Sequence, residues 1–595
     1  MFRKGFSTLL KQKLVNNVPK RCAYLKLGKY NSWRQSQDGR RVKFALVMLG
    51  TVAGAGGLLG VYVNYASNQA KDDRKKKIVV LGSGWGAVSF LKHLKPDSYE
   101  VSVVSPSNYF LFTPFLPSVT VGTVEGRSIV EPIRKIIRKY QKQSAEFYEA
   151  ECIGVDANEK RVYCQDTSGI IGKQSDFSLD YDILVVAVGA ETATYGTPGV
   201  KEYTHFLKDI KDVQRIRSNI MDHLETAAYP GQEDSEVSRL LHFVVVGGGP
   251  TGVEFAAELR DFVGSELSIL YPKIKDKIKL TLIGGYRGVL STYDQEIGNY
   301  VEDKFKDDNI EIVQGARVLE INSSDIKLRD GKTKETVDLP YGMCVWAAGI
   351  SPRQLTKDII KSIPGQRNKN ALLTDDYLQV KNAPGVFAIG DCGTIEMKKL
   401  MSDVTDLFEK ADANKDGSLS MDEFREIMEQ AKNLYPQVSL HFSTEYNESL
   451  QRAFEKADEN KDQRLSLDEF KGILAEIDKE LKSLPATAQV ATQQGRYLAN
   501  FLSTKAQGDV GKEANQDLAA LGAVPFAYRH LGSFAYVGNN RAVLELPLIG
   551  SFKGFGAMLL WRAAYTNECV GMRMKVLVVF DWLKSEIFGR DTSRI

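Results

Sequence analysis

The chain has 595 residues, 43% of them hydrophobic and 26% charged, which is the composition of a globular protein with about three or four domains. Its formal net charge of +3 gives no reason to expect nucleic acid as a partner. The six cysteines include no C-x-x-C pair, which argues against a disulfide framework and against a structural zinc site.

Residues 1–43 form a basic segment in which Asp38 is the only acidic residue. Apolar side chains recur among its Lys and Arg residues and can line one face of a helix: Phe2, Phe6, Leu9, Leu10 and Leu14. This pattern is typical of a mitochondrial presequence, and a disordered basic tail is the alternative.

Residues 44–66 contain no charged side chain. At about 1.5 Å per residue, a helix of this length spans a hydrocarbon core of about 30 Å, so we expect one transmembrane helix. A glycine-rich linker is the alternative. Basic residues flank the segment on both sides, and the positive-inside rule favours an N-terminus in the matrix.

The globular part begins with an apolar strand, a glycine turn and a helix start. Gly82 and Gly84 occupy the first two glycine positions of G-x-G-x-x-G, and Ala87 occupies the third. Gly86 directly precedes Ala87. Such a turn lets the backbone approach a pyrophosphate at the helix N-terminus. We expect residues 75–239 to form the first part of a dinucleotide-binding domain.

Two more positions in this part, Ser105 and Gly189, are candidates for contact with the dinucleotide. Ser105 follows the second strand, where many such units carry an acid for the ribose. Thr113 lies in an apolar, turn-rich segment that comes next. The apolar strand at 181–190 ends in small residues around Gly189, which indicates close approach of the backbone to a ligand.

Residues 240–350 repeat the pattern as a second dinucleotide unit. Gly247, Gly249 and Gly252 fill G-x-G-x-x-G after an apolar strand. The first glycine permits the tight turn, the second the approach of the pyrophosphate, and the third close packing of helix on strand. The unit closes with a strand that ends in small residues at Gly349, as the first unit does.

This recurrence predicts two similar domains, one inserted into the other. Residues 351–399 then return to the first domain. Asp391 ends a short apolar strand there, where it can bind a ribityl hydroxyl or lie near a pyrophosphate.

Taken together, the two glycine motifs, the segments 105–117 and 487–495, Leu560-Trp561-Arg562 and residues 588–591 resemble the type II (alternative, rotenone-insensitive) NAD(P)H:quinone oxidoreductases of mitochondria. The resemblance covers residues 75–595. It implies an α/β fold with two Rossmann-like domains, FAD in the first, NADPH or NADH in the second, and ubiquinone as acceptor. It also leads us to expect a homodimer.

The resemblance assigns roles to individual residues of this chain. Flavin contacts are implied for Gly82, Gly84, Gly86, Ser105, Thr113, Gly189, Asp391, Ala488 and Gln489. Nicotinamide-nucleotide contacts are implied for Gly247, Gly249, Gly252, Arg287 and Gly349. Catalytic roles near the flavin and the quinone are implied for Glu254, Gln489 and Thr492. Glu254 is expected to orient substrate or deliver a proton, or else only to complement the helix dipole.

The strand that ends at Ile283 bears on the choice of nicotinamide. Aligned on the family, Gly284 replaces the usual glutamate, which removes repulsion against a 2′-phosphate, and Arg287 is near enough in sequence to accept that phosphate. We therefore hypothesise that NADPH is used. The alternative is NADH bound at a looser ribose site.

Residues 400–483 form an insert that contains two candidate calcium loops. The first matches the EF-hand ligand spacing through Asp412, Asn414, Asp416, Ser418 and Glu423, with Gly417 at the turn. The second offers Asp458, Asn460, Asp462 and Glu469. It departs from the pattern at Gln463, where glycine is expected, and at Arg464, whose charge is unfavourable beside a cation. We predict that Ca²⁺ binds the first loop well and the second weakly or not at all, and that the pair regulates the enzyme. A solvated acidic loop is the alternative.

Residues 484–530 form the predicted flavin and quinone segment, in which Gln489, Thr492 and Gln493 lie on one helical face. Residues 531–595 form the predicted membrane-anchoring region, because 552–588 mixes aromatic and aliphatic residues with basic ones. No stretch there is long enough and uncharged enough to span a bilayer. We expect helices lying in the membrane interface, with aromatic residues in the headgroup layer: Trp561, Tyr565, Trp582 and Phe588.

The sequence thus predicts a calcium-regulated, non-pumping, FAD-dependent enzyme that passes electrons from NADPH or NADH to ubiquinone. We expect it at the mitochondrial inner membrane, in contact with lipid and facing the intermembrane space. One alternative is an NAD(P)H oxidase of the apoptosis-inducing-factor type. Another is a calcium-responsive membrane scaffold that keeps a flavoprotein fold.

Overall fold

The computed structural model describes residues 75–593, except for 96–98, 144, 171, 173, 174, 286, 287, 397, 398, 433, 434, 436, 437, 439–445, 480–483, 506–523 and 548. The expected presequence and transmembrane helix at 1–43 and 44–66 lie outside the described residues. Within the described ranges, no helix combines the length and the apolar character needed to cross a membrane.

The first domain is built on a sheet with the strand order β20-β8-β1-β2-β5-β6-β7. The strands are β1 (Lys76–Leu81), β2 (Tyr99–Ser105), β5 (Ala145–Asp156), β6 (Arg161–Asp166), β7 (Asp176–Asp180), β8 (Ile183–Val186) and β20 (Val386–Ala388). Pairing is parallel from β20 to β5 and antiparallel from β5 to β7. β8 is buried along its whole length, as expected for a parallel strand covered on both faces.

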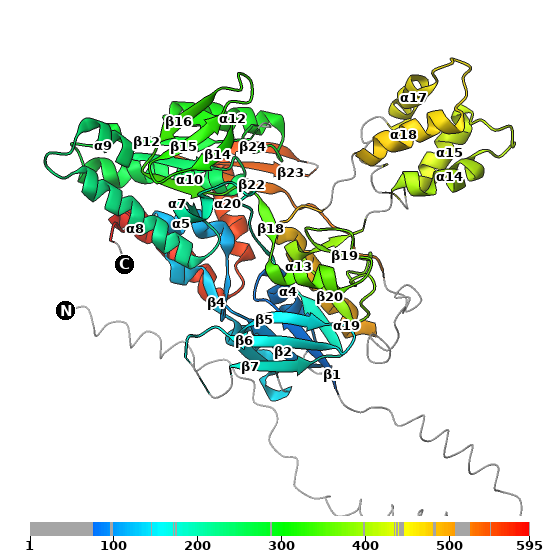
Figure 1. Ribbon diagram of the computed structural model, residues 1–595, viewed down its shortest axis with the longest axis horizontal. Helices are drawn as coiled ribbons and strands as arrows, with labels where there is room; N and C mark the ends of the chain where they lie inside the picture. The colour runs from blue at the N-terminus through cyan, green and yellow to red at the C-terminus, as the bar shows by residue number, and fades with distance from the viewer. Residues whose placement is uncertain are drawn as a thin grey trace, which may run out of the picture. The chain divides into compact units, whose positions relative to one another are not determined.

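Two helices lie side by side on this sheet (Figure 1): α4 (Trp85–His93), which follows β1, and α19 (Ala488–Lys505), which comes from the far end of the sequence. They approach closely because Gly495 of α19 faces α4: a Cβ at this position would lie 2.9 Å from the backbone nitrogen of Phe90. The segment 488–505 is therefore part of the first domain's core.

The second domain carries a parallel sheet in the order β10-β17-β11-β12-β13. These strands are β10 (His205–Phe206), β11 (His242–Val246), β12 (Lys279–Ile283), β13 (Ile310–Val313) and β17 (Met343–Trp346), and they are joined by α8 (Ile210–Ala227), α9 (Asp234–Leu240), α10 (Pro250–Phe262) and α12 (Gln295–Asp307). An antiparallel sheet of β14 (Arg317–Ile321), β15 (Asp325–Arg329) and β16 (Thr336–Pro340) follows β13.

The chain enters and leaves the second domain through two short strands that pair with each other. β9 (Ala190–Thr192) and β18 (Ile350–Pro352) run antiparallel. After β18, α13 (Gln354–Ser362), β19 (Leu372–Thr374), β20 and β21 (Gly393–Ile395) complete the first domain. The α/β class expected from the sequence is confirmed.

Among its described residues, the insert has four α-helices that share a hydrophobic core of their own. They are α14 (Val404–Ala411), α15 (Met421–Ala431), α17 (Tyr446–Ala457) and α18 (Leu467–Lys479). Phe424 and Phe470 are fully buried at the centre of this core. The two loops between the helices meet in a short antiparallel bridge from Leu419 to Leu465.

The C-terminal region begins with the antiparallel strands β22 (Ser533–Gly538), β23 (Arg541–Leu546) and β24 (Gly550–Gly554), of which β22 packs against α10. Two helices follow, α20 (Phe555–Glu568) and α21 (Met572–Phe588). The remaining elements are short: β3 (Tyr109–Leu111), η1 (Thr113–Phe115), α5 (Leu116–Thr120), η2 (Gly126–Ser128), β4 (Val130–Pro132), α6 (Ile133–Ile136), η3 (Ile137–Gln143), α7 (Val200–Tyr203), η4 (Val263–Leu267), α11 (Ser268–Leu270), η5 (Lys275–Lys277), η6 (Gly390–Cys392) and η7 (Leu400–Asp403).

Candidate functional site

The first glycine turn joins β1 to α4 and passes close to the end of β8. Gly82 has φ +111°, and a side chain there would overlap the carbonyl oxygen of Ala187. Gly84 has open space around it, since a Cβ there would meet no atom within 4 Å. The turn therefore leaves room in front of the N-terminus of α4, where partial positive charge favours a phosphate.

Other predicted flavin residues lie in hydrogen-bonded pairs around this turn. The Ser105 hydroxyl donates to Ser83 Oγ at 2.9 Å, and the indole nitrogen of Trp85 donates to Thr113 Oγ1 at 3.1 Å. Burial raises the pKa of the Asp391 carboxyl, and the charge of Lys208 opposes this shift. These hydroxyls and this carboxylate are suited to the sugar and phosphate groups of FAD.

Gln494 is a residue of this region that the sequence did not single out. Its side chain is 2% exposed, and its Oε1 accepts the backbone N–H of Gly390 at 2.7 Å. This bond holds the turn before Asp391 against α19. The sequence offers no signal for it, because the two residues are 104 positions apart.

The second glycine turn repeats the geometry of the first. Gly247 has φ +130°, and a Cβ there would lie 2.6 Å from the carbonyl oxygen of Ala347. Gly249, at the N-terminus of α10, has open space. At the end of β17, a side chain on Gly349 would overlap the hydroxyl group of Tyr195. The second turn can therefore also admit a pyrophosphate.

The structure describes only part of the segment after β12 that is predicted to select NADPH. Gly284 follows β12 directly, and the nearest atom to a Cβ there would be the carbonyl oxygen of Gly288 at 4.0 Å. Arg287 lies outside the described residues, so its predicted role stays a prediction.

Glu254 is a buried carboxyl in α10, just beyond the first turn of that helix. It is 6% exposed, and its Oε1 accepts the backbone N–H of Tyr536 in β22 at 3.1 Å. Burial raises the pKa of Glu254 to about 8. Glu254 is therefore mostly protonated at neutral pH and can donate a proton to a bound acceptor.

Three tyrosines lie near Glu254, one just before α12, one in β22 and one in α20. Tyr293, Tyr536 and Tyr565 are all buried enough that the pKa of each phenol is raised above its ordinary value. They stay protonated across the physiological range. The carboxyl of Glu258, one helical turn further along α10, lies near enough to raise the pKa of Glu254.

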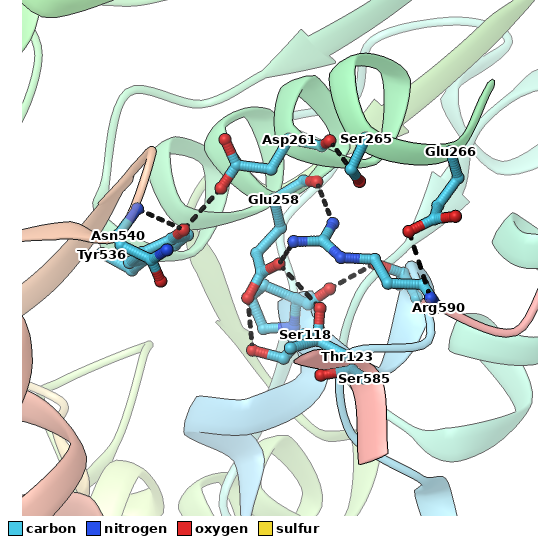
Figure 2. A network of polar contacts seen from close by, with 12 residues as sticks. Ser118, Thr123, Glu258, Asp261, Ser265, Glu266, Tyr536, Asn540, Ser585 and Arg590 are labelled. Atoms are coloured by element: carbon cyan, nitrogen blue, oxygen red, sulfur yellow. Dashed lines mark hydrogen bonds and ion pairs between the residues drawn. The ribbon is translucent and has the colours of Figure 1, made fainter. Parts of the chain in front are cut away.

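Figure 2 shows Glu258 at the centre of a polar network between α10, the α5 segment and the end of the chain. The hydroxyls of Ser118 and Thr123 donate to its carboxylate at 2.7 and 3.1 Å, and the Arg590 guanidinium lies 3.5 Å from Oε2. Arg590 also donates to the carbonyl oxygen of Glu258 at 3.1 Å, and its backbone N–H donates to Glu266 at 3.2 Å.

Arg590 is a counter-charge to the buried carboxyl of Glu258. Burial raises the pKa of Glu258, and the positive charge of Arg590 opposes this shift. Both side chains are shielded from water, with 5% of Glu258 and 13% of Arg590 exposed. The network therefore ties the C-terminal tail to the helix that carries Glu254.

The predicted catalytic residues of α19 make backbone contacts. The Gln489 amide nitrogen donates to the carbonyl oxygen of Gly532 at 2.7 Å, and its oxygen accepts the backbone N–H of Leu531 at 3.2 Å. The carbonyl oxygen of Thr492 accepts the Ser89 hydroxyl at 2.6 Å. Gln489 thus holds the segment that leads into β22, next to Glu254.

An aromatic cluster connects the first domain to the C-terminal helices. Phe115 lies 5.7 Å from Trp561 and 5.8 Å from Trp582 between ring centroids, and Phe112 lies 6.2 Å from Tyr565. The expectation that Trp561 and Trp582 lie in the headgroup layer is wrong, because they are 2% and 9% exposed. Each packs against Phe115 instead, since one face of α20 and α21 covers the domain core.

The opposite face of these two helices exposes apolar side chains, among them Phe588 with 81% of the residue exposed, and its place in the headgroup layer stays a prediction. The other large exposed apolar side chains of this face are Phe555, Leu559, Leu560, Met572, Val576, Val579, Phe580, Leu583 and Ile587. Exposed apolar side chains gathered in this number on two helices are typical of a membrane or protein contact.

The two calcium loops have the same backbone hydrogen bonds. Asp412 accepts the backbone N–H groups of positions five and six at 3.1 and 2.9 Å, and Asp458 does the same at 3.1 and 2.9 Å. Gly417 has φ +82°, and Gln463 takes a similar φ of +62°. Gln463 thus keeps the EF-hand turn at the cost of a strained backbone.

The Arg464 side chain does not act on its own loop as expected from the sequence. Its guanidinium forms an ion pair with Asp416 and donates to Ser418 Oγ at 3.0 Å, both in the first loop. Glu423 at position twelve accepts the backbone N–H of Ser420 at 2.9 Å. Within the described part of the chain, the structure contains no group of three or more His, Cys, Asp or Glu side chains placed to hold a metal ion. The loops fit Ca²⁺ by their oxygen donors and turn geometry.

Comparisons with known proteins agree with this geometry. Residues 76–412 match the pyridine nucleotide-disulphide oxidoreductase family, residues 530–591 the NDH2 C-terminal domain, and residues 404–428 the EF hand.

Full-length relatives are also found. The chain is 43% identical over 561 residues to the external alternative NAD(P)H-ubiquinone oxidoreductase B3, mitochondrial, of Arabidopsis thaliana, covering 92% of this chain and 96% of the relative. It is 35% identical to the external alternative NADH-ubiquinone oxidoreductase, mitochondrial, of Yarrowia lipolytica, covering 95% and 88%. The structure of NDH2 from Plasmodium falciparum in complex with NADH is similar, with TM-score 0.73, 31% identity, and coverage of 87% and 100%.

Proposed function

The chain belongs to the mitochondrial external alternative NAD(P)H-ubiquinone oxidoreductases, and we propose that it passes electrons from NADPH or NADH through FAD to ubiquinone under the control of Ca²⁺. The expectation drawn from the sequence motifs is confirmed at the level of family, enzyme class and cofactors. We also propose that it acts at the mitochondrial inner membrane, and the word "mitochondrial" in the names of its relatives supports the organelle.

The observation that carries this function is the pair of glycine turns, each following a strand with parallel neighbours, with the Glu254-bearing helix beside the aromatic cluster. When bound, FAD supplies the chemistry of hydride acceptance and two-electron transfer. The chain's own residues would hold it at Gly82, Gly84, Ser105, Thr113 and Asp391. Gln489 and Gln494 would fix the neighbouring backbone by the bonds described above.

Glu254 is proposed as the proton donor to the quinone. Reduction of a quinone to a quinol consumes two protons as well as two electrons, so a dry site needs a protonated group at hand. Glu254 is buried, and its pKa of about 8 keeps it protonated at neutral pH. The surrounding tyrosines and Trp561 exclude water from this position.

The exposed apolar face of α20 and α21 is proposed to bind the membrane. The helices have 14 and 17 residues, which suits a position in the interface better than a span. A membrane on this face would let ubiquinone reach the aromatic cluster without crossing water. The intermembrane-space orientation, in line with the word "external" in the relatives' names, and the homodimer both stay proposals.

The use of NADPH is also a proposal. Its support is the glycine at position 284, which leaves no carboxylate side chain directly after β12 to repel a 2′-phosphate. The relatives include proteins named for NAD(P)H and a protein named for NADH.

The proposed function is tested by following the flavin directly in the purified protein. Anaerobic NADPH or NADH should bleach the flavin absorbance, and a soluble ubiquinone analogue should restore it much faster than oxygen does. Equal reoxidation by oxygen would favour an NAD(P)H oxidase. A protein without bound flavin would favour the scaffold.

A further inference from the structure

We propose that Arg464 acts as a tethered cation that competes with Ca²⁺ for the first EF-hand loop and thereby sets the calcium affinity of that loop. The inference rests on calcium binding by the first loop, which belongs to the proposed function. Arg464 itself belongs to the second loop, which lies outside the segment 404–428 that matches the EF hand.

The two loops are joined where their positions eight meet. The backbone N–H of Leu419 donates to the carbonyl oxygen of Leu465 at 2.8 Å, and the reverse bond measures 2.9 Å. Arg464 precedes Leu465, so its side chain starts beside the first loop. The guanidinium then reaches Asp416 and Ser418, with which it forms an ion pair and a 3.0 Å hydrogen bond.

Asp416 is at position five of the first loop, where EF-hands supply a carboxylate oxygen to Ca²⁺. A cation bound in this loop must share that carboxylate with the guanidinium or displace it. In either case the two positive charges repel, and the ion pair with Asp416 is weakened or lost. Arg464 therefore disfavours the calcium-bound state of the first loop.

The position of Arg464 in its own loop makes this arrangement possible. It occupies position seven of the second loop, and position seven contributes its backbone carbonyl oxygen to the ion. The side chain can therefore serve the first loop without removing a ligand from the second. The second loop also keeps its turn, because the Arg464 backbone N–H donates to Asp462 Oδ1 at 2.8 Å.

The exposure of the pair decides the size of the effect. Of the two side chains, 46% of Arg464 and 34% of Asp416 remain exposed, so water and salt screen the interaction. A unit charge about 5 Å from a divalent ion in such surroundings changes the affinity by roughly three- to tenfold. Arg464 is therefore expected to tune the affinity of the first loop without abolishing binding.

The experiment is a calcium titration of the full-length protein by competition with a chromophoric chelator, which needs no turnover. Arg464→Gln should lower the Kd of the first loop by about three- to tenfold. The matched control is Arg452→Gln, which removes an arginine of α17 that pairs with Glu448 of the same helix and belongs to neither loop. It should leave the Kd within about twofold. Glu423→Gln, alone and combined with Arg464→Gln, identifies the first-loop site.

The outcomes separate this proposal from the proposed function. A gain in affinity for Arg464→Gln that is absent from Arg452→Gln and from the Glu423→Gln background supports it. Calcium binding that is unchanged by Arg464→Gln overturns it and leaves calcium control intact. The absence of calcium binding from both wild type and Arg464→Gln overturns calcium control and this proposal together.

Discussion

Two arginine–carboxylate pairs in this molecule have the same chemistry and opposite surroundings. Arg590 and Glu258 are 13% and 5% exposed at the end of the chain, whereas Arg464 and Asp416 are 46% and 34% exposed in the insert. Water screens the second pair, and almost none reaches the first. Burial therefore separates a permanent part of the fold from a contact that an ion can displace.

The further hydrogen bonds of the buried pair also make it a permanent part of the fold. Glu258 also accepts two hydroxyl groups, and Arg590 also donates to a backbone carbonyl, so the loss of either residue leaves buried polar groups unpaired. Removing one partner of a buried pair typically costs about 3–5 kcal/mol, and removing one of an exposed pair about 0–1 kcal/mol. The following predictions test this ordering.

Arg590→Gln should have the largest effect on stability, because it leaves the Glu258 carboxyl buried without its cation. We expect a loss of about 3 kcal/mol, which lowers the apparent Tm by roughly 5–10 °C in thermal unfolding. Glu258→Gln combined with Arg590→Gln should recover part of the loss. An unchanged Tm for Arg590→Gln would show that the tail is not held by this pair.

Glu254→Gln should slow quinone reduction by about 100-fold, because it removes the proposed general acid, while anaerobic bleaching of the flavin by NADH stays near wild type. In wild type, the rate should fall as the pH rises through about 8, where Glu254 loses its proton. The charge on Glu258 favours the protonated form of Glu254, and the tyrosines around it do not titrate in this range.

The variant should lack this alkaline decline. Stopped-flow reoxidation of reduced enzyme by a soluble quinone, measured between pH 6 and 9, checks both points. A variant that keeps the wild-type pH profile would remove Glu254 from proton delivery.

Phe580→Glu combined with Ile587→Glu should weaken binding to anionic lipid vesicles by more than about tenfold, since each change places a charge on the proposed membrane face. The residues are 61% and 70% exposed. Vesicle flotation measures the effect, and Ile153→Glu on β5 is the control, being 52% exposed on another element. Equal flotation of the double variant and the control would place the membrane contact elsewhere.

Gln463→Gly should have the smallest effect. The left-handed backbone at Gln463 costs about 1 kcal/mol, but the loop already has this turn, so relieving the strain should stabilise the insert and change the calcium affinity of the second loop by less than about twofold. Titration in the Glu423→Gln background isolates that loop. No calcium binding at the second loop in either form would confirm that departures other than the turn residue disable it.

Local patterns predicted the parts of the site that depend on a few neighbouring residues. Gly82 and Gly247 were identified because a tight turn packed against a second strand leaves no room for a side chain. The spacing of the glycines in each motif reflects this requirement. The first calcium loop was found for the same reason, since its ligands follow one another within twelve residues.

Contacts between distant segments were not predictable. Arg590 meets Glu258 across 332 positions, and Gln494 meets Gly390 across 104. The orientation of the apolar helices at the C-terminus was not predictable either. Their two faces are similarly hydrophobic, so the pattern did not show that Trp561 and Trp582 face the core while Phe588 faces outwards. The direction of Arg464 likewise depends on the bridge between the loops.

The most direct test is quinone reduction by the purified protein with NADPH or NADH, each in the presence of Ca²⁺ or of a chelator. The account predicts rapid quinone reduction with NADPH that collapses on chelation and returns when Ca²⁺ is restored. Quinone reduction with NADH alone, equal with Ca²⁺ and with chelator, would contradict both the NADPH assignment and calcium control through the insert.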